Sequence, residues 1–225
     1  MNNNWIVNNY IDYLSEQYPI YYDKMSGETL NKLKDLYFSV NDISVMCNIF
    51  NKSEYQEKNF YNLLCEFKSY ASRLLLIIPI NDKYLVDSLF RLLIEKLYRM
   101  IYAHHHGHLL ESSIRNHERR KMSTRLMGKL NKKEELDILY GEYSELIHHS
   151  SPTSTDLLNF RKLSEVELGL EKYINDQLEV LKEIFMLDFF IPKFKGKHID
   201  LASKLTLKEQ LKEYTSKLLE EECII

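Results

Sequence analysis

Four side chains that can hold phosphate and move protons fall on one stripe of a predicted helix over residues 84–108. Arg91, Glu95 and Arg99 are spaced four residues apart, and His106 follows Arg99 by seven, close to two full turns. An imidazole changes protonation near neutral pH, and a guanidinium neutralises a phosphate through its planar fork. Together these groups suit attack of an RNA 2′-hydroxyl on the adjacent phosphate. That reaction needs no cofactor, and we expect none.

A second polar stripe borders the apolar face of a predicted helix over residues 134–149. Three hydrogen-bonding side chains recur there at every fourth position: Tyr140, Ser144 and His148. If the two helices pack together, their stripes form one site, in which Glu95 pairs with the arginines one turn to either side. Tyr140, Ser144 and Tyr102 are expected to support that site, and His148 is expected to act in it.

The same two stripes also have a purely structural interpretation. A buried helix tolerates charged side chains only when they are paired, so an Arg–Glu–Arg ladder completed by a tyrosine and a histidine would fix how two core helices meet. Both interpretations make the two helices neighbours. They differ in whether an arginine and an imidazole open together into a cleft.

Three adjacent histidines end the first stripe, at positions 104 to 106. On a continuous helix His104 points about 140° away from Arg99, whereas His106 shares the stripe of Arg99. His106 is therefore the first choice for the group that transfers protons. His104 and, from the second helix, His148 are its rivals.

A basic segment follows over residues 115–133, with eight Lys and Arg against one Glu in a chain whose net charge is −3. Clustered cations supply much of the affinity for a polyanion, so the segment is expected to guide RNA. The alternative is a solvated helix face balanced by acidic neighbours. The expected RNA-binding residues are Arg115, Arg119, Arg120, Lys121, Arg125 and Lys129.

The composition favours long helices joined by short connections. The chain has 225 residues, is 44% hydrophobic and contains only 6 Gly and 4 Pro. Apolar residues recur at helical spacing through most of it, which predicts an all-α bundle of about six to eight helices in one domain over residues 1–225. Ser26 is a plausible cap, Pro79 should end one helix, and Asn81 or Asp82 should begin the helix that carries the first stripe.

The C-terminal part of the chain is predicted to form a long helix over residues 156–190 and a charged amphipathic helix over residues 200–221. The second of these is a candidate for an appended packing arm or a dimer contact. Docking onto the core is an equally good interpretation.

Several other classes of protein and site are poor candidates. The start of the chain lacks a basic region followed by an apolar core, and the longest apolar run is far shorter than a membrane span, so we expect a cytoplasmic protein without membrane contact. Three scattered cysteines fit neither a disulfide framework nor a CxxC site. His104 and His108 could chelate a metal, but only Glu111 lies near enough to help, and we expect no metal.

Two stretches resemble the HEPN superfamily, which comprises small all-α ribonucleases and nucleotide-binding proteins of toxin–antitoxin, CRISPR and abortive-infection systems. The run RMIYAHHH, starting at Arg99, fits the R-x4-6-H motif of that superfamily. FRLLIEKLYRMIYAH and the later LYGEYSELIHHSSP also look like HEPN-like proteins of phage defence, and the similarity covers about residues 81–152.

The resemblance implies a metal-independent endoribonuclease that acts as a toxin or antiviral effector. The implied core spans about residues 55–190. The implied partners are RNA, a second copy of the chain, and an antitoxin or other defence-system protein. The implied catalytic residues are Arg91, Glu95, Arg99, His104, His106 and His148. A non-catalytic HEPN-like module that binds a protein or a nucleic acid is the alternative.

Overall fold

Helices make up every regular element in the part of the chain that the structure describes. The structure is a computed structural model, and it describes residues 4–50, 58–107, 116–149 and 169–225. The predicted all-α class is confirmed. One hydrophobic core runs from Val7 in the first helix to Ile224 near the C-terminus. No described helix is long and apolar enough to cross a lipid bilayer.

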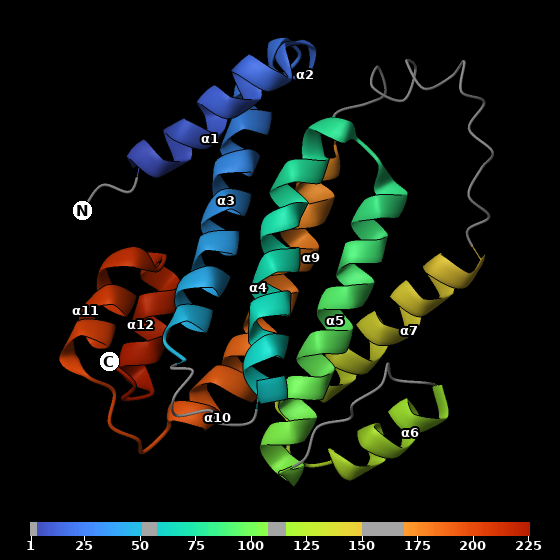
Figure 1. Cartoon of the computed structure of the whole chain (residues 1–225), viewed down its shortest axis with the longest axis vertical. Helices are drawn as coiled ribbons and strands as arrows, with labels where there is room; N and C mark the ends of the chain where they lie inside the picture. Colours follow the sequence, from blue (N-terminus) through green and yellow to red (C-terminus); the bar gives the residue numbers. More distant parts are fainter. Residues whose placement is uncertain (1–3, 51–57, 108–115, 150–168) are drawn as a thin grey trace.

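Four long helices lie side by side and enclose this core, as Figure 1 shows: α3 (Gly27–Asn48), α4 (Lys58–Ile77), α5 (Lys83–His106) and α9 (Leu170–Phe185). Helix α4 packs on both α3 and α5, and α9 packs chiefly on α3. Their facing sides carry buried aliphatic and aromatic residues at helical spacing, so apolar burial accounts for the arrangement.

The helix that carries the first polar stripe, α5, is the most enclosed near its C-terminal end. Every residue from Leu97 to Ala103 is buried. The predicted N-cap Asp82 is confirmed, because its side chain accepts a hydrogen bond from the Leu85 N–H at 3.1 Å. Gly107, in the left-handed region at φ 71°, ends the helix.

The N-terminal helices α1 (Asn4–Gln17) and α2 (Pro19–Asp23) cover one end of the bundle. The Tyr10 hydroxyl donates to the Leu75 carbonyl at 2.8 Å and so fastens α1 to α4. The predicted cap at Ser26 is also confirmed, since its hydroxyl accepts from the Thr29 N–H at the start of α3.

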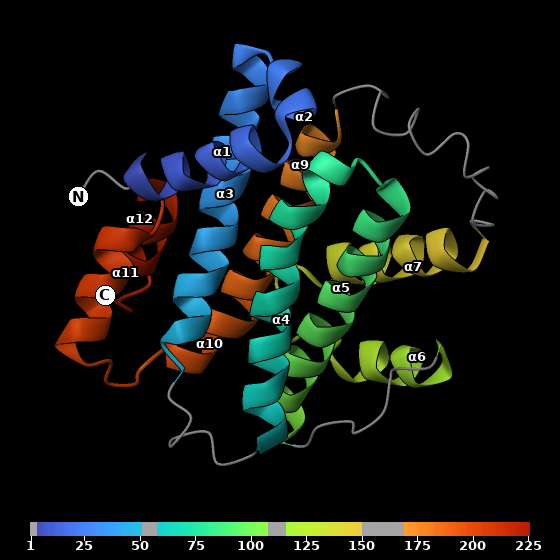
Figure 2. The ribbon, with the colours of Figure 1, turned by 45° about the horizontal axis from the view of Figure 1, so that its top comes forward.

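Two helices flank α5 on the side away from α3: α6 (Asn116–Arg125) and α7 (Lys133–His149), which Figure 2 shows lying one beside the other. Helix α7 packs directly on α5. The two predicted polar stripes therefore do belong to neighbouring helices.

Helix α9 runs without interruption into a π-helical turn, η3 (Met186–Phe190), and then into the short α10 (Ile191–Phe194). The rings of Phe190 and Phe194 pack against Phe50, and the ring centres of Phe50 and Phe194 are 4.9 Å apart. This aromatic cluster fixes α10 beneath α3, close to the end of α5 (Figure 1).

The C-terminal segment forms two helices, α11 (Leu201–Gln210) and α12 (Glu213–Glu221), so the prediction of one continuous helix over residues 200–221 is wrong. The chain becomes extended at Leu211, and the N–H of Lys212 donates to Asp42 of α3 at 2.9 Å. A contact across the fold thus replaces a bond within the expected helix.

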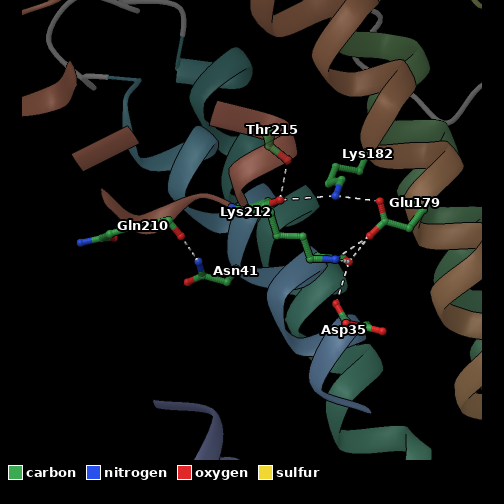
Figure 3. A network of polar contacts seen from close by, with 9 residues as sticks. Asp35, Asn41, Glu179, Lys182, Gln210, Lys212 and Thr215 are labelled. Carbon is green, nitrogen blue, oxygen red and sulfur yellow. Dashed lines mark hydrogen bonds and ion pairs between the residues drawn. The ribbon is translucent and has the colours of Figure 1, made fainter. Parts of the chain in front are cut away.

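A buried polar network, drawn in Figure 3, holds these two helices against α3 and α9. The Asp42 carboxylate also accepts from Thr215 at 2.8 Å and lies 3.3 Å from the Lys182 ammonium, with side-chain exposures of 0% for Asp42 and 3% for Lys182. Glu179 lies 2.7 Å from Lys182 and 2.9 Å from Lys212. Two carboxylates and two ammonium groups balance one another. Asp42 and Lys182 are the buried members, and removal of either would leave the charge of the other buried without this partner, at a cost of about 3–5 kcal/mol.

The two carboxylates of this network respond differently to their surroundings. Burial raises the pKa of Asp42, and its contacts with Lys182 and Lys212 only partly offset that effect. Burial would also raise the pKa of Glu179, but hydrogen bonds from Lys182, Ser39 and Lys212 outweigh it and lower the pKa from 4.5 to about 2. Glu179 is thus the group through which acid weakens the network.

We expect Glu179→Gln to destabilise the protein at neutral pH by about 1–3 kcal/mol, because charge-assisted hydrogen bonds are lost. Since the folded-state pKa of Glu179 is depressed, its stabilisation is present above about pH 4.5 and disappears as the pH falls towards 2. Urea titrations over this range should show that the difference in stability between the variant and the wild type shrinks as the pH falls. The control Glu209→Gln, at an exposed position of α11, should change stability little at any pH. A constant difference across the range would contradict this role.

Candidate functional site

The upper parts of the two polar stripes meet through Arg91 and Tyr140. An Nη2 hydrogen of Arg91 is donated to the Tyr140 hydroxyl at 2.6 Å, and the guanidinium carbon lies 4.1 Å from the centre of the Tyr140 ring. Arg91 Nη1 is 3.3 Å from Glu95 Oε2, which is the predicted pairing one turn along α5. Helix α6 closes the cluster by placing Arg119 over the same ring, at 5.3 Å.

This upper cluster is largely covered. The side chains of Arg91 and Glu95 are 17% and 12% exposed, and Tyr140 is fully buried. Burial raises the pKa of Tyr140, and the positive charge of Arg91 opposes that rise. The Arg–Glu–Tyr arrangement satisfies its charges by mutual contact, so its geometry suits holding α5 against α7 rather than receiving a substrate.

Ser144 and His148 are the other two members of the second stripe. The Ser144 hydroxyl donates to the carbonyl of Tyr140, one turn back in its own helix, at 2.6 Å. His148 lies in the last turn of α7, and its side chain is outside the described part of the structure.

The lower part of the α5 stripe carries Arg99, Tyr102 and His106 on one face. Arg99 and Tyr102 are buried, and His106 is half-buried. The rings of Tyr102 and His106 stack with centres 4.5 Å apart. Arg125, in the last turn of α6, donates from Nη1 to the Tyr102 hydroxyl at 2.7 Å.

Lys129 completes this lower cluster from the loop between α6 and α7. Its ammonium lies 3.5 Å from Nε2 of His106. An ammonium group can only donate, so the contact is a hydrogen bond in the tautomer of His106 that leaves Nε2 without a proton. In that tautomer His106 presents a proton acceptor beside two exposed cations, Arg125 and Lys129. We call His106, Arg125 and Lys129, together with Tyr102, the His106 cluster.

His104 occupies a different side of the helix end. Its ring meets Phe189 edge to face at 6.4 Å. Burial, together with the positive charge of Lys193 and Lys197, lowers the pKa of His104 to about 4. At neutral pH His104 is thus an uncharged ring packed on η3, separated from the Arg125 side of the helix as the predicted angle requires.

A single carboxylate, Asp137 of α7, positions α6 beside α5. It accepts from Tyr98 of α5 at 2.9 Å and from Ser123 of α6 at 2.6 Å. Lys133 approaches it at 2.7 Å and Arg119 at 3.5 Å. Burial would raise the pKa of Asp137, but the hydrogen bonds from Lys133, Ser123 and Tyr98 outweigh it and lower that pKa.

The predicted RNA-binding cations divide into two groups. Arg119 is half-buried and faces Asp137. The exposed cations, which make no ion pair with any carboxylate in the described ranges, are Arg120, Lys121, Arg125 and Lys129. Arg115 lies outside the described residues. The alternative of a helix face balanced by acidic neighbours thus holds for Arg119. The four exposed cations leave a surplus of positive charge on α6 and on the loop that follows it.

Sequence reasoning missed two carboxylates that build the site. Asp137 sits among ordinary acidic residues of α7, and nothing in its spacing marks it. Asp188 had a readable signal, because it is the one charged residue in the apolar run over 184–191. It accepts from the N–H groups of Asn131 and Lys132 at 2.6 and 2.9 Å, just before α7 begins.

A pocket lies elsewhere, between α5, α7 and α9. It has a volume of about 860 Å³ and is lined by Lys83, Glu142, Tyr143, Glu145, Leu146, Tyr173 and Gln177. Behind it the Tyr143 and Tyr173 hydroxyls lie 2.7 Å apart, and Tyr173 donates to Asp87 at 2.8 Å. Burial, with the Asp87 contact, raises the pKa of Tyr173 to about 12. This relay joins α5, α7 and α9, and it contains none of the predicted site residues.

The described residues offer no site for a metal ion. No group of three or more His, Cys, Asp or Glu side chains in the described ranges is arranged to hold a metal ion, and His108 and Glu111 fall outside those ranges. Comparisons with protein-family models, curated proteins and solved structures gave no match for the chain. Membership of the HEPN superfamily stays a prediction based on the two sequence motifs.

We expect Asp137→Asn to loosen α6, because the amide cannot hold Lys133 and Arg119 by charge and donates where the carboxylate accepted. The free energy of unfolding should fall by about 1–3 kcal/mol. Amide hydrogen exchange over residues 119–125 should quicken more than exchange in α3. Asp176→Asn, at an exposed position of α9, is the matched control and should change neither quantity. Unchanged protection of α6 in the Asp137 variant would show that apolar packing alone positions this helix.

Proposed function

We propose that the chain is a HEPN-like, metal-independent endoribonuclease that acts as a toxin or antiviral-defence effector. The observation that carries the proposal is the His106 cluster. It combines a half-exposed imidazole, whose Nε2 faces Lys129, with two exposed cations, Arg125 and Lys129, on the surface where α6 leaves positive charge unbalanced. A proton acceptor beside phosphate-binding groups is the minimum that RNA transesterification requires.

The proposed reaction assigns His106 as the base. Its Nε2 takes the proton of a 2′-hydroxyl, the 2′ oxygen forms a bond to the adjacent phosphorus, and the bond from phosphorus to the 5′ oxygen breaks. The products are a 2′,3′-cyclic phosphate and a 5′-hydroxyl. The departing 5′ oxygen must gain a proton, for which Lys129 and His148 are the candidates. Arg125, together with Arg99, stabilises the charge that develops on the phosphate.

The remaining predicted residues take positioning roles in this proposal. Arg91, Glu95 and Tyr140 hold α5 against α7, and Tyr102 orients His106 by stacking. His104 keeps no role in proton transfer, because it packs against Phe189.

The proposal extends to partners and location. RNA is the substrate, a second copy of the chain completes the site, and an antitoxin or other defence-system protein controls it. A cytoplasmic location suits the three cysteines, Cys47, Cys65 and Cys223, which are all free thiols.

A non-catalytic HEPN-like module that binds a nucleic acid or a protein is the second candidate. The pairing of Arg91 with Glu95 and the burial of Arg99 favour it, because these charges serve helix packing rather than a substrate. The two candidates share the basic surface and differ in whether His106 transfers a proton.

We expect purified protein in EDTA to cut unstructured RNA and to leave 2′,3′-cyclic phosphate ends. His106→Ala should lower the cleavage rate by about 10²–10⁴-fold, because the general base is lost, while RNA affinity stays near that of the wild type. Cleavage of a fluorescent RNA, together with anisotropy binding, measures both quantities. Lys208→Ala, on the exposed surface of α11, is the control and should match the wild type.

Two results would contradict this proposal, one for catalysis itself and one for the role of His106. RNA that binds but stays intact in the wild type would favour the non-catalytic module. An equal rate for His106→Ala and the wild type would remove His106 from the reaction. Thermal unfolding of each variant separates a lost base from a lost fold.

A further inference from the structure

The end of α5 lies between two basic segments that are distant in the sequence. One is the α6 side, which presents Arg125 and Lys129. The other follows η3 and carries three lysines within five residues: Lys193, Lys195 and Lys197. Figure 1 shows α10 and the C-terminal end of α5 at the same end of the bundle, opposite α1 and α2. Sequence patterning gave no reason to join the two segments.

Hydrogen bonds connect the loop that follows Lys129 to η3, which precedes the second segment. Asp188 of η3 accepts from the N–H groups of Asn131 and Lys132, and the Asn131 side chain donates to the Leu187 carbonyl at 3.3 Å. The loop that carries Lys129 is therefore fixed to the turn that leads into Lys193. Asp188 is buried, and both of its carboxylate oxygens accept from these N–H groups.

The histidines at the end of α5 lie within the electrostatic influence of both segments. After burial and the neighbouring His105, the charges of Lys193 and Lys197 lower the pKa of His104. Burial and then Lys129 lower the pKa of His105, against an opposite effect of Asp188. One helix turn is thus exposed to positive charge from both sides.

The second segment has little acidic compensation in the described ranges. Lys197 is exposed and makes no ion pair there. Lys195 lies 3.0 Å from Glu222, but with exposures of 67% and 37% this pair contributes little and is easily exchanged for a phosphate. Lys193 lies 4.9 Å from the centre of the Phe60 ring, which keeps its charge near the surface.

We infer that Lys193, Lys195 and Lys197 continue the RNA-binding surface across the end of α5. A single RNA strand would run from the α6 cations, over His106, to these lysines, held by its phosphates and without base recognition. The inference rests on the proposed function for its choice of RNA. A single strand is the fitting form, since an unpaired backbone can follow an uneven surface and present a phosphate to His106.

The test uses the full chain and an unstructured RNA with 2′-O-methyl groups, which cannot be cut, so binding is measured apart from catalysis. Affinity is determined by anisotropy between about 50 and 200 mM KCl for the wild type, Lys197→Ala, Lys197→Glu and the double variant Lys193→Ala with Lys197→Ala. The control is Lys24→Ala with Lys172→Ala, which removes two exposed lysines from the opposite end of the bundle.

We expect the double variant to bind several-fold more weakly at low salt. The slope of log affinity against log salt should lose about 0.7 per missing phosphate contact, or about 1.4 for two. Lys197→Glu should weaken binding more than Lys197→Ala, because repulsion is added. The Lys197→Glu variant also keeps the contact of Lys193 with the Phe60 ring. A loss of binding in this variant therefore does not come from a loss of that packing. The control should keep the wild-type slope.

The outcomes separate this inference from the proposed function. If Arg125→Ala with Lys129→Ala weakens binding while the Lys197 variants keep the affinity and slope of the wild type, the inference is wrong and the proposed function stands. If the Lys197 variants lose affinity as expected but unmodified RNA is never cut, the second surface is supported and catalysis is not. Absence of any RNA binding at low salt would overturn both.

Discussion

The burial of α5 is the constraint on which the candidate site depends. From Leu97 to Ala103 the helix has no exposed residue, yet Tyr98 and Tyr102 in that stretch carry hydroxyl groups. A buried polar group without a partner costs about 1–3 kcal/mol, so neighbouring helices must supply partners. Helix α6 has one apolar residue, Met122, and its position follows from polar contacts to α5 and α7 more than from apolar burial.

The same contacts determine which cationic side chains are available to bind an anion. Arg91 and Arg119 turn inward to Tyr140 and their carboxylates, so their charge is spent on helix packing. Arg125 is different because its partner is a neutral hydroxyl. Its charge remains available at the surface while the Tyr102 contact fixes where it points. A segment that reads as uniformly basic therefore becomes a helix with a structural side and an electrostatic side.

Much of the frame could be predicted because its signals are local. Asp82 begins α5 as predicted, and the stripe spacing alone placed Arg91 beside Glu95 and turned His104 away from His106. The break at Leu211 could not be predicted, since the Lys212 N–H is satisfied by Asp42, about 170 residues earlier in the chain. Nor could the link from Asp188 to the α6–α7 loop, which depends on how a π-helical turn aims one carboxylate.

The histidines at the end of α5 illustrate how position separates chemically identical groups. His104 is half-buried against Phe189, near Lys193 and Lys197, so its ring stays neutral and packs on η3. His106, two residues on, is turned by about 200° towards α6, where a tyrosine stacks on it and Lys129 faces its Nε2. The positive charge near both rings resides on lysine and arginine side chains. Attraction of a polyanion and acceptance of a proton are thus assigned to different side chains, and either property can change without loss of the other.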